Sequence, residues 1–333
     1  MLQTKNPGKH NSDATLPLAS PQVTVVSVTS DDVGQRLDNF LFRTLRGVPK
    51  SRVYRALRNG EVRVNKKRCK AEYRLAAEDL LRIPPLRVDE KPAAAPVRGG
   101  LLQELEQAIL FENDLVLVVN KPAGLAVHGG SGVDYGLIEA VRKMRPECPR
   151  IELAHRLDRD TSGCTILTKK SSALRSIHQQ LREKTMTKTY VALVKGRWPR
   201  RKTWVDAPLE KNVLKSGERM VKVSPDGKTS QTRFQIREVF EAATLVEASP
   251  VTGRTHQIRV HAQHAGFPLC GDDKYGNRED DAWLKSIGLK RLFLHASSVT
   301  LSLPGRDKPL TIEAPLPVEL EVVLDTLREG SQA

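Results

Sequence analysis

The chain has few of the features that mark membrane or secreted proteins. Aromatic residues make up only 5% of its 333 residues. No apolar run approaches the length of a membrane span. The first ten residues are polar and basic, and they lack the apolar stretch of a secretory signal. These absences predict a protein that has no membrane partner.

Cysteine is also scarce. The four cysteines lie far apart in the sequence, and no two have the C-x-x-C spacing of a zinc ribbon or a redox pair. They are Cys69, Cys148, Cys164 and Cys270. Scattered thiols of this kind are typical of a reducing compartment, so the cysteine pattern predicts a cytoplasmic protein.

Acidic residues are the third shortage. The chain has 39 Asp and Glu against 54 Lys and Arg, which gives a net charge of +15. Such an excess attracts polyanions through the release of counterions, so nucleic acid is the first expected partner. A membrane surface would require a basic amphipathic helix with an aromatic face, and no segment shows that pattern.

The length of the chain predicts at least two domains. Residues 1–22 are polar and rich in proline and glycine, which is typical of a disordered tail. Residues 34–83 and 105–325 have the apolar periodicity of folded units. Between them, residues 84–104 have the Pro/Ala/Gly composition of a linker.

The 34–83 unit is small and strongly basic. Its pattern predicts two short helices, a turn at Asn65-Lys66 and a closing strand, and Gly60 is expected just after the second helix. It contains 14 Lys and Arg against 5 Asp and Glu. Cations crowd on the second helix and the following turn, which favours phosphate binding over a merely solvated face. The proposed RNA-binding residues are Arg52, Arg55, Lys66, Lys67 and Arg68.

The 105–325 unit contains many apolar strand patterns. They cover residues 115–119, 165–168, 190–194, 232–240, 243–248, 293–303 and 310–312. Strands that follow one another in sequence tend to pair antiparallel, which predicts an α+β fold with a large, mixed but mainly antiparallel sheet. No heptad or internal repeat is present, and we expect a monomer.

No pattern in the chain is typical of a nucleotide cofactor or a metal site. The glycine-rich residues 129–132 lack the lysine of a phosphate-binding loop. His256, His261 and His264 lie close together, but no cysteine or carboxylate stands at ligand spacing beside them. We therefore expect chemistry that uses no metal and no cofactor.

The most informative stretch is residues 155–164, His-Arg-Leu-Asp-Arg-Asp-Thr-Ser-Gly-Cys. An acid among cations, such as Asp158, stays ionised and can act as a nucleophile or a base. A second carboxyl at Asp160 is compatible with a glycosidase-like pair. Alternatively, Asp158 only pairs with Arg156 or caps the turn at residues 161–163. Spacing alone leaves these interpretations open.

The same string closely resembles the active-site motif of the RluA family of RNA pseudouridine synthases. Four further segments resemble other motifs of that family and follow in the same order. They are residues 120–128, 188–190, 253–261 and 291–296. The 34–83 unit resembles an S4 RNA-binding domain. With that unit in front, the chain is most similar to members that modify several separated uridines of 23S (large-subunit) ribosomal RNA.

The resemblance implies a role for each of four residues. Asp158 would be the catalytic aspartate, and Arg259 the cation that holds and orients it. Tyr190 would stack on the uracil and help to remove its C5 proton. Arg156 would fill the space that the flipped base vacates. Their alternative roles are a phosphate contact for Arg259, an ordinary strand aromatic for Tyr190 and a salt bridge for Arg156.

The local sequence also predicts where Arg259 lies. Thr255 is a reasonable N-cap and Gly266 a reasonable helix end, so Arg259 is expected in the first turns of a helix.

Two other functions are compatible with the sequence. A non-catalytic S4-type RNA-binding or ribosome-assembly factor would need only the basic unit. A base-removing glycosylase would also use an aspartate and a flipped base. The sequence does not separate free rRNA from a pre-ribosomal particle as substrate, or a covalent from a glycal route.

Overall fold

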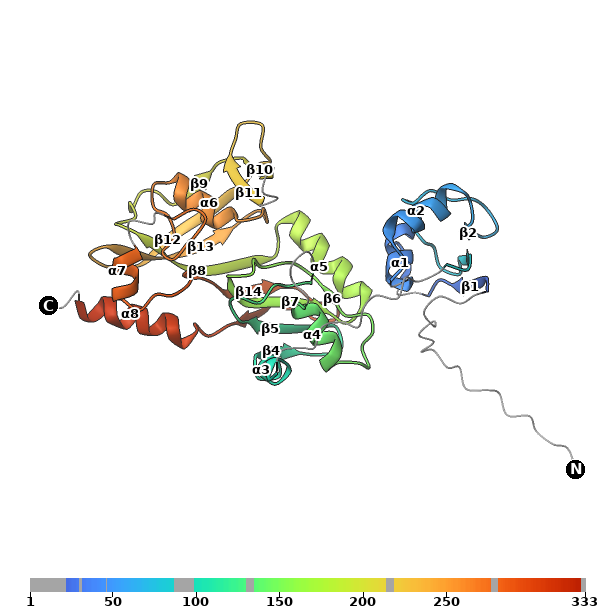
Figure 1. The fold of residues 1–333 in the computed structure, drawn as a ribbon, viewed down its shortest axis with the longest axis horizontal. Helices are drawn as coiled ribbons and strands as arrows, with labels where there is room; N and C mark the ends of the chain where they lie inside the picture. Colours follow the sequence, from blue (N-terminus) through green and yellow to red (C-terminus); the bar gives the residue numbers. More distant parts are fainter. Residues whose placement is uncertain are drawn as a thin grey trace, which may run out of the picture. The chain divides into compact units, whose positions relative to one another are not determined.

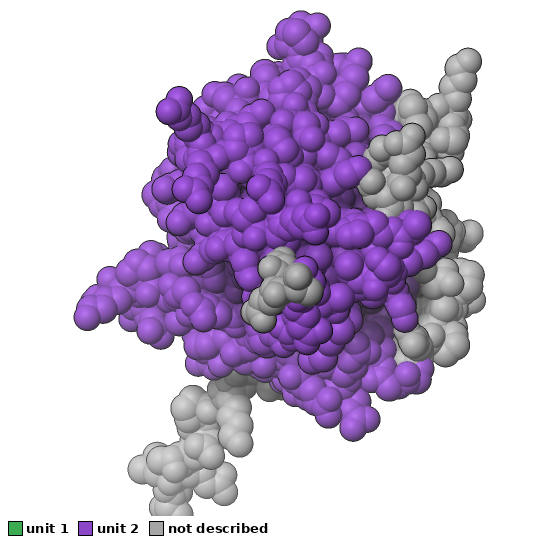
Figure 2. Space-filling view, turned by 90° about the vertical axis from the view of Figure 1, so that its left-hand side faces the viewer, with its two compact units in different colours: residues 1–94 green, residues 95–333 purple. Residues whose placement is uncertain are grey.

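The computed structural model describes residues 22–29, 32–45, 47–86, 99–129, 135–213, 219–276 and 281–330. The chain divides into two compact units, residues 1–94 and residues 95–333. Figure 2 shows one face of the second unit as a continuous body. Apart from Gln22, the predicted tail lies outside the described residues, as do residues 87–98 of the predicted linker. Among the described helices, none combines the length and the apolar character needed to cross a bilayer.

In the first unit, two helices pack on a small antiparallel sheet. Helices α1 (Leu37–Thr44) and α2 (Lys50–Arg58) bury their apolar faces against strand β3 (Leu80–Ile83). Strand β3 lies between β1 (Thr24–Ser27) and β2 (Arg63–Val64). The sequence analysis did not predict β1, which precedes the predicted unit of residues 34–83.

The predicted turns of this unit have the expected backbone. Gly60 follows α2 with φ +67°. Asn65 and Lys66 have φ values of 49° and 67°. Both predictions are therefore confirmed, and both arise from left-handed conformations that suit glycine and asparagine.

A ten-stranded sheet forms the centre of the second unit (Figure 1). Its path is β4-β5-β7-β14-β8-β13-β12-β9, with β6 beside β7 and β15 beside β14. The strands are β4 (Ile109–Glu112), β5 (Val116–Lys121), β6 (Glu152–Leu153), β7 (Ser162–Thr168), β8 (Thr187–Lys195), β9 (Trp204–Asp206), β12 (Gln231–Val239), β13 (Ala243–Pro250), β14 (Leu294–Leu301) and β15 (Leu310–Glu313). All described pairs are antiparallel except β7–β14. The predicted α+β class with a mixed, mainly antiparallel sheet is confirmed.

Both faces of this sheet are covered. On β5, Val116 and Val118 point into the core beneath α5 (Ser171–Glu183) and α6 (Gln257–His264), whereas Leu117 and Val119 pack with α3 (Leu101–Gln107) and α4 (Leu137–Met144). Near β8 the second face is covered by α8 (Val318–Gly330), seen below that strand in Figure 1. Because both faces are buried there, β5 and the second half of β8 have continuous apolar sequences, whereas β12 alternates between buried and exposed residues.

Three remaining elements complete the second unit. The short helix α7 (Asp281–Ser286) packs beside α8. Strands β10 (Leu209–Val213) and β11 (Arg219–Val223) form a separate hairpin against α6. The hairpin supports the loop in front of α6 through a hydrogen bond from Val221 to Tyr275.

Two helices differ from the sequence prediction. The first is α3, which begins inside the segment predicted as a linker. Its Leu105 is fully buried among the apolar side chains of β5 and α4, and this contact stabilises the helix. The second is α8, which lies in a region predicted to be rich in strands. Its buried residues Leu320, Val323, Leu324 and Leu327 have the i, i+3, i+4, i+7 spacing of a helix face, so this signal was present.

Candidate active site

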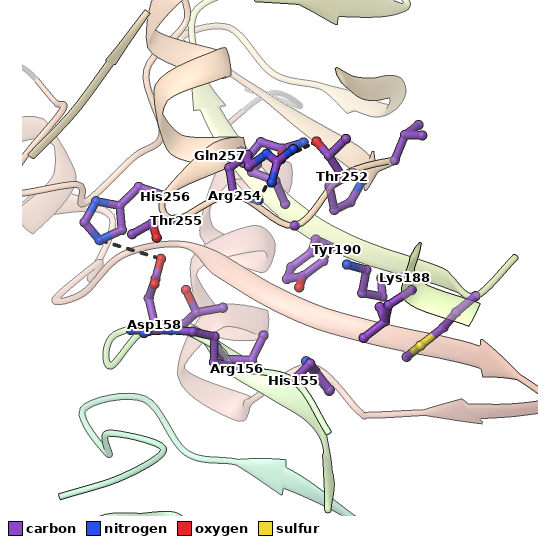
Figure 3. Close-up of a pocket in the computed structure, with 18 of the residues that line it drawn as sticks. His155, Arg156, Asp158, Lys188, Tyr190, Thr252, Arg254, Thr255, His256 and Gln257 are labelled. Atoms are coloured by element: carbon purple, nitrogen blue, oxygen red, sulfur yellow. Dashed lines mark hydrogen bonds and ion pairs between the residues drawn. The ribbon is translucent and has the colours of Figure 1, made fainter. Parts of the chain in front are cut away.

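Asp158 lies on the loop between β6 and β7, at the edge of a cavity of about 330 Å³ (Figure 3). The cavity is also lined by Arg156 on the same loop, by Tyr190 on β8 and by Arg259 on α6. Asp158 is the only carboxylate among the described residues that line it. The four side chains that the resemblance singles out thus surround one hollow, although they come from segments a hundred residues apart.

Lys121 anchors the loop that carries Asp158. This lysine is fully buried at the end of β5, and its Nζ donates to the carbonyl oxygens of Pro122, Leu125 and Arg159 at 2.8, 2.8 and 3.1 Å. Burial lowers the pKa of Lys121 to about 7. Three carbonyl acceptors oppose that shift, because a neutral amine has only two N–H groups to donate. The ammonium therefore joins the loop after β5 to the loop that carries Asp158.

Replacing Lys121 with methionine should loosen this junction. The Lys121→Met variant leaves three carbonyl oxygens without their donor, and we expect the free energy of unfolding to fall by about 2 kcal/mol. Urea denaturation measures this change. An exposed lysine gives the control: Lys222→Met, on β11, should change stability by less than about 0.5 kcal/mol. Equal stability of wild type and Lys121→Met would contradict the assigned role.

The other end of the loop is fixed by the parallel contact between β7 and β14. Gly163 has φ +111°, and a Cβ there would lie 2.3 Å from the carbonyl oxygen of Ala296. Beside it, the Ser162 hydroxyl lies 2.9 Å from His295 Nδ1, while His295 Nε2 is 3.2 Å from the carbonyl oxygen of Ala314. Burial lowers the pKa of His295 to about 4, so the ring is neutral and can accept from Ser162 while it donates to Ala314.

Tyr190 lies against the cavity from β8. Its side chain is 8% exposed. Burial raises the pKa of the phenol, and the nearby Asp158 charge raises it further. The hydroxyl is therefore neutral at physiological pH and can donate a hydrogen bond.

The partner of Arg259 differs from the one that the resemblance implies. Its Nε and NH2 donate to the two carboxylate oxygens of Asp272 at 2.7 and 2.6 Å. Asp272 has a fully buried side chain, and it also accepts from the backbone N–H groups of Lys274 and Tyr275. Burial opposes the charge of Arg259, but its hydrogen bonds to Asp272 and the charges of Asp272 and then Asp158 raise the pKa of the guanidinium. Arg259 is thus held by Asp272 and acts on Asp158 through space.

His256 faces Asp158 across the cavity and forms an ion pair with it only when the imidazole is protonated. Its Nε2 lies 3.9 Å from Asp158 Oδ2, and its Nδ1 is 2.8 Å from the Tyr275 hydroxyl. That hydroxyl accepts from the N–H of Val221 on β11, so the hairpin supports the ring. Burial lowers the pKa of His256, and Asp158 opposes this effect. Sequence reasoning did not pair His256 with Asp158 and so missed this contact.

The start of α6 also differs from the prediction by one residue. His256, not Thr255, is the N-cap, and its φ of 52° lies in the left-handed region that non-glycine residues rarely adopt. No side chain of the described residues caps the helix, and the Gln257 side chain instead accepts from the N–H of Arg254 in the preceding loop. Arg259 is nevertheless in the first turn, and Gly266 follows the helix end with φ +92°, as predicted.

Two cavity residues have polar groups without a protein partner among the described residues. Arg156 is exposed, and among the described residues no carboxylate forms an ion pair with it, since Asp160 pairs with Arg159 at 3.1 Å. Thr161 is 2% exposed, and within the described part of the chain its hydroxyl has no hydrogen-bond partner. A buried hydroxyl without a partner is costly, so the cavity is suited to a polar ligand.

Comparison with known proteins identifies the family. The profile of the RNA pseudouridylate synthases matches residues 115–264, and that of the S4 domain matches residues 35–81. A protein of Pasteurella multocida (strain Pm70) named ribosomal large subunit pseudouridine synthase C is 55% identical over 92% of this chain and 94% of its own length. The chain belongs to the RNA pseudouridine synthase family. The Escherichia coli (strain K12) synthase of the same name is 55% identical over 93% of this chain and 98% of its own length.

A solved structure agrees with this membership. The human RNA pseudouridylate synthase domain containing 4 protein is 27% identical, has a TM-score of 0.54 and covers 68% of this chain and 95% of its own. The chain is therefore an RNA pseudouridine synthase that carries an S4 domain.

The S4 domain of this synthase presents its cations unequally. Arg55, Lys66, Lys67 and Arg68 are exposed, as their proposed role requires. Arg52 is half-buried and forms an ion pair with Glu61 at 2.9 Å, so its guanidinium is partly engaged within the domain. The sequence prediction missed Arg58 and the 40% exposed Tyr54, which line a shallow groove together with Arg55, Arg68 and Lys70.

Proposed function

We propose that this synthase converts specific uridines of 23S ribosomal RNA to pseudouridine, with Asp158 as the catalytic group. The observation that carries the proposal is Asp158, the one carboxylate among the described cavity residues, which shares the cavity walls with Arg156, Tyr190 and Arg259. The ribosomal substrate follows the names of relatives that are about 55% identical over nearly the whole chain. An S4 domain in front of the catalytic unit is compatible with a large RNA as substrate.

The reaction breaks the C1′–N1 bond, turns the uracil and forms a C1′–C5 bond. The C5 proton is lost and N1 gains a proton, so nothing is oxidised or consumed. Asp158 either adds to C1′ or takes a proton from C2′ to give a glycal. In both routes one carboxylate must lie beside the ribose, and the Lys121 ammonium and the β7–β14 contact fix the loop that presents it.

The base must leave the RNA stack before it can react. Flipping costs a few kcal/mol, which a protein group that fills the gap can offset. Arg156 is suited to this role because it is exposed at the cavity and has no carboxylate partner among the described residues. Tyr190, with its neutral ring beside Asp158, would stack on the flipped uracil. Single-stranded or looped RNA is the expected target, because deep A-form grooves hide the base edges.

The S4 domain would bind RNA phosphates. We expect the combined variant Lys66→Gln, Lys67→Gln, Arg68→Gln to bind 23S rRNA fragments more weakly. The slope of log affinity against log salt should become shallower by about 2, since each lost phosphate contact removes about 0.7 to 0.9 from it. Filter binding at several salt concentrations measures both effects. Arg328→Gln, at an exposed ion pair of α8, is the control, and an unchanged slope in the triple variant would contradict phosphate binding.

We further propose a cytoplasmic monomer that acts on free 23S rRNA or on an assembling large subunit. The alternative is an RNA-binding assembly factor without catalysis. Reverse-transcription mapping of carbodiimide-treated 23S rRNA, from cells with and without the protein, separates the two. Stops that depend on the protein would identify the modified uridines. The same stops in both samples would favour the assembly factor.

A further inference from the structure

Lys188 lies two residues before Tyr190 on β8, and its role is not explained by the mechanism so far. Side chains two residues apart on a strand point to the same face, and both residues line the cavity. Figure 3 shows Lys188 and Tyr190 side by side on their strand, at the hollow that also holds Asp158. A Cβ at Gly253, on the loop before α6, would lie 3.7 Å from Lys188 Nζ. The ammonium therefore reaches from β8 to the opposite wall.

The other cations of the cavity are either paired or exposed. Arg259 is held by Asp272, and Arg254 is exposed and donates to the carbonyl oxygen of Thr229. Arg156 and Lys184 are exposed to water. Lys188 alone is half-buried, and within the described part of the chain its ammonium has neither a carboxylate partner nor a hydrogen-bond acceptor.

An unpaired, partly buried ammonium is unfavourable in such a cavity. Burial lowers the pKa of Lys188 because it penalises the charged form. The charge also acts on its neighbour His155, whose pKa falls to about 3 through burial and then through Lys188. A cation kept under such conditions gains most from a ligand that brings negative charge to it.

We propose that the Lys188 ammonium donates a hydrogen bond to a carbonyl oxygen of the flipped uracil and stabilises the negative charge on that base during the reaction. This inference rests on the proposed function. When the C1′–N1 bond breaks, its electron pair goes to the uracil and is shared between N1 and the ring carbonyls. Lys188 stays protonated throughout. The proton lost from C5 and the proton gained at N1 are exchanged elsewhere.

A phosphate is the competing ligand for this ammonium, but the surroundings favour a base. Lys188 shares the cavity wall with Tyr190 and with the apolar side chains of Met186, Ile258 and Leu294. Flat aromatic and apolar surfaces suit a uracil ring better than a hydrated phosphate. The exposed cations of the cavity that remain for phosphates are Lys184 and Arg254.

The test uses the full-length protein and a 23S rRNA fragment under single-turnover conditions. Lys188→Met should slow cleavage of the C1′–N1 bond about 100-fold, in line with the loss of one donor to a developing anion. RNA affinity should change less than about threefold, because the contact strengthens only as charge develops. Lys188→Arg should recover part of the rate. Lys195→Met, at the far end of the same strand and outside the cavity lining, should keep the wild-type rate.

A second substrate separates anion stabilisation from a structural role. In 5-fluorouridine, the fluorine withdraws electrons and itself stabilises the uracil anion. The rate lost in Lys188→Met should therefore be at least threefold smaller with this substrate than with uridine. Its consumption can be followed by nuclease digestion and chromatography.

Each outcome decides between defined alternatives. An equal loss with both substrates would show a structural role, and loss of RNA affinity without loss of rate would show a phosphate contact. Either result, or a wild-type rate in Lys188→Met, would overturn the inference. If the wild-type protein itself forms no pseudouridine, it is the proposed function that fails.

Discussion

Asp158→Asn is expected to abolish pseudouridine formation while RNA binding survives. The amide has nearly the same shape as the carboxylate, but it can neither attack C1′ nor accept the C2′ proton. We expect a loss on the order of 10⁴-fold or more in the single-turnover rate, as is usual when a group that takes part directly in the chemistry is removed. Release of tritium from RNA labelled at uracil C5 measures the reaction, and filter binding measures affinity.

A matched control is available two residues away. Asp160 is a carboxylate on the same loop, but it pairs with Arg159 and lies outside the cavity lining. Asp160→Asn should keep its rate within about threefold of wild type, since a surface ion pair is worth little. Retained tritium release in Asp158→Asn would refute the assignment. Free uracil among the wild-type products would instead indicate a base-removing glycosylase.

Asp272→Ala should produce the largest loss of stability. The substitution leaves the Arg259 guanidinium buried without its partner, and it also removes the acceptor of two backbone N–H groups. Breaking a buried ion pair by removing one partner costs about 3–5 kcal/mol. Urea denaturation should show this decrease in the free energy of unfolding of the catalytic unit.

Asp325→Ala provides the comparison. Asp325 forms an exposed ion pair with Arg328 on α8, and its loss should cost less than about 0.5 kcal/mol. If Asp272→Ala were as stable as wild type, Arg259 would not depend on Asp272. The milder Asp272→Asn variant, which keeps one acceptor oxygen, should fold at moderate temperature and allow its rate to be measured.

Much of the fold could be predicted from local patterns. Central strands such as β5 have apolar runs because both of their faces are buried, and β12 alternates because only one of its faces is buried, so both signals are present in the sequence. Helix α3 was missed because a single fully buried leucine, Leu105, does not make a periodic pattern. Most residues of the candidate site were predicted from the resemblance to family motifs. The spacing around Asp158 alone did not distinguish a catalytic role from a turn-capping role.

The contacts around the site could not be predicted, since each joins residues without a spacing signal. Asp272 lies in a loop beyond α6, and nothing in the sequence ties it to Arg259. The three acceptors of Lys121 are backbone carbonyls. Every residue has such a group, so the sequence does not indicate which ones Lys121 contacts. His256 is recognisable only after folding, because its contact with Asp158 depends on a left-handed backbone at the start of α6.

The division of the chain has a consequence for how such enzymes acquire new targets. Every residue that lines the Asp158 cavity belongs to the unit of residues 95–333, whereas the exposed lysines and arginines of the S4 domain belong to residues 1–94. Under the proposed function, RNA binding by the first unit and catalysis by the second can therefore change separately in evolution. An enzyme of this kind can acquire a new RNA target through changes in the S4 domain alone, and the geometry of its catalytic site stays the same.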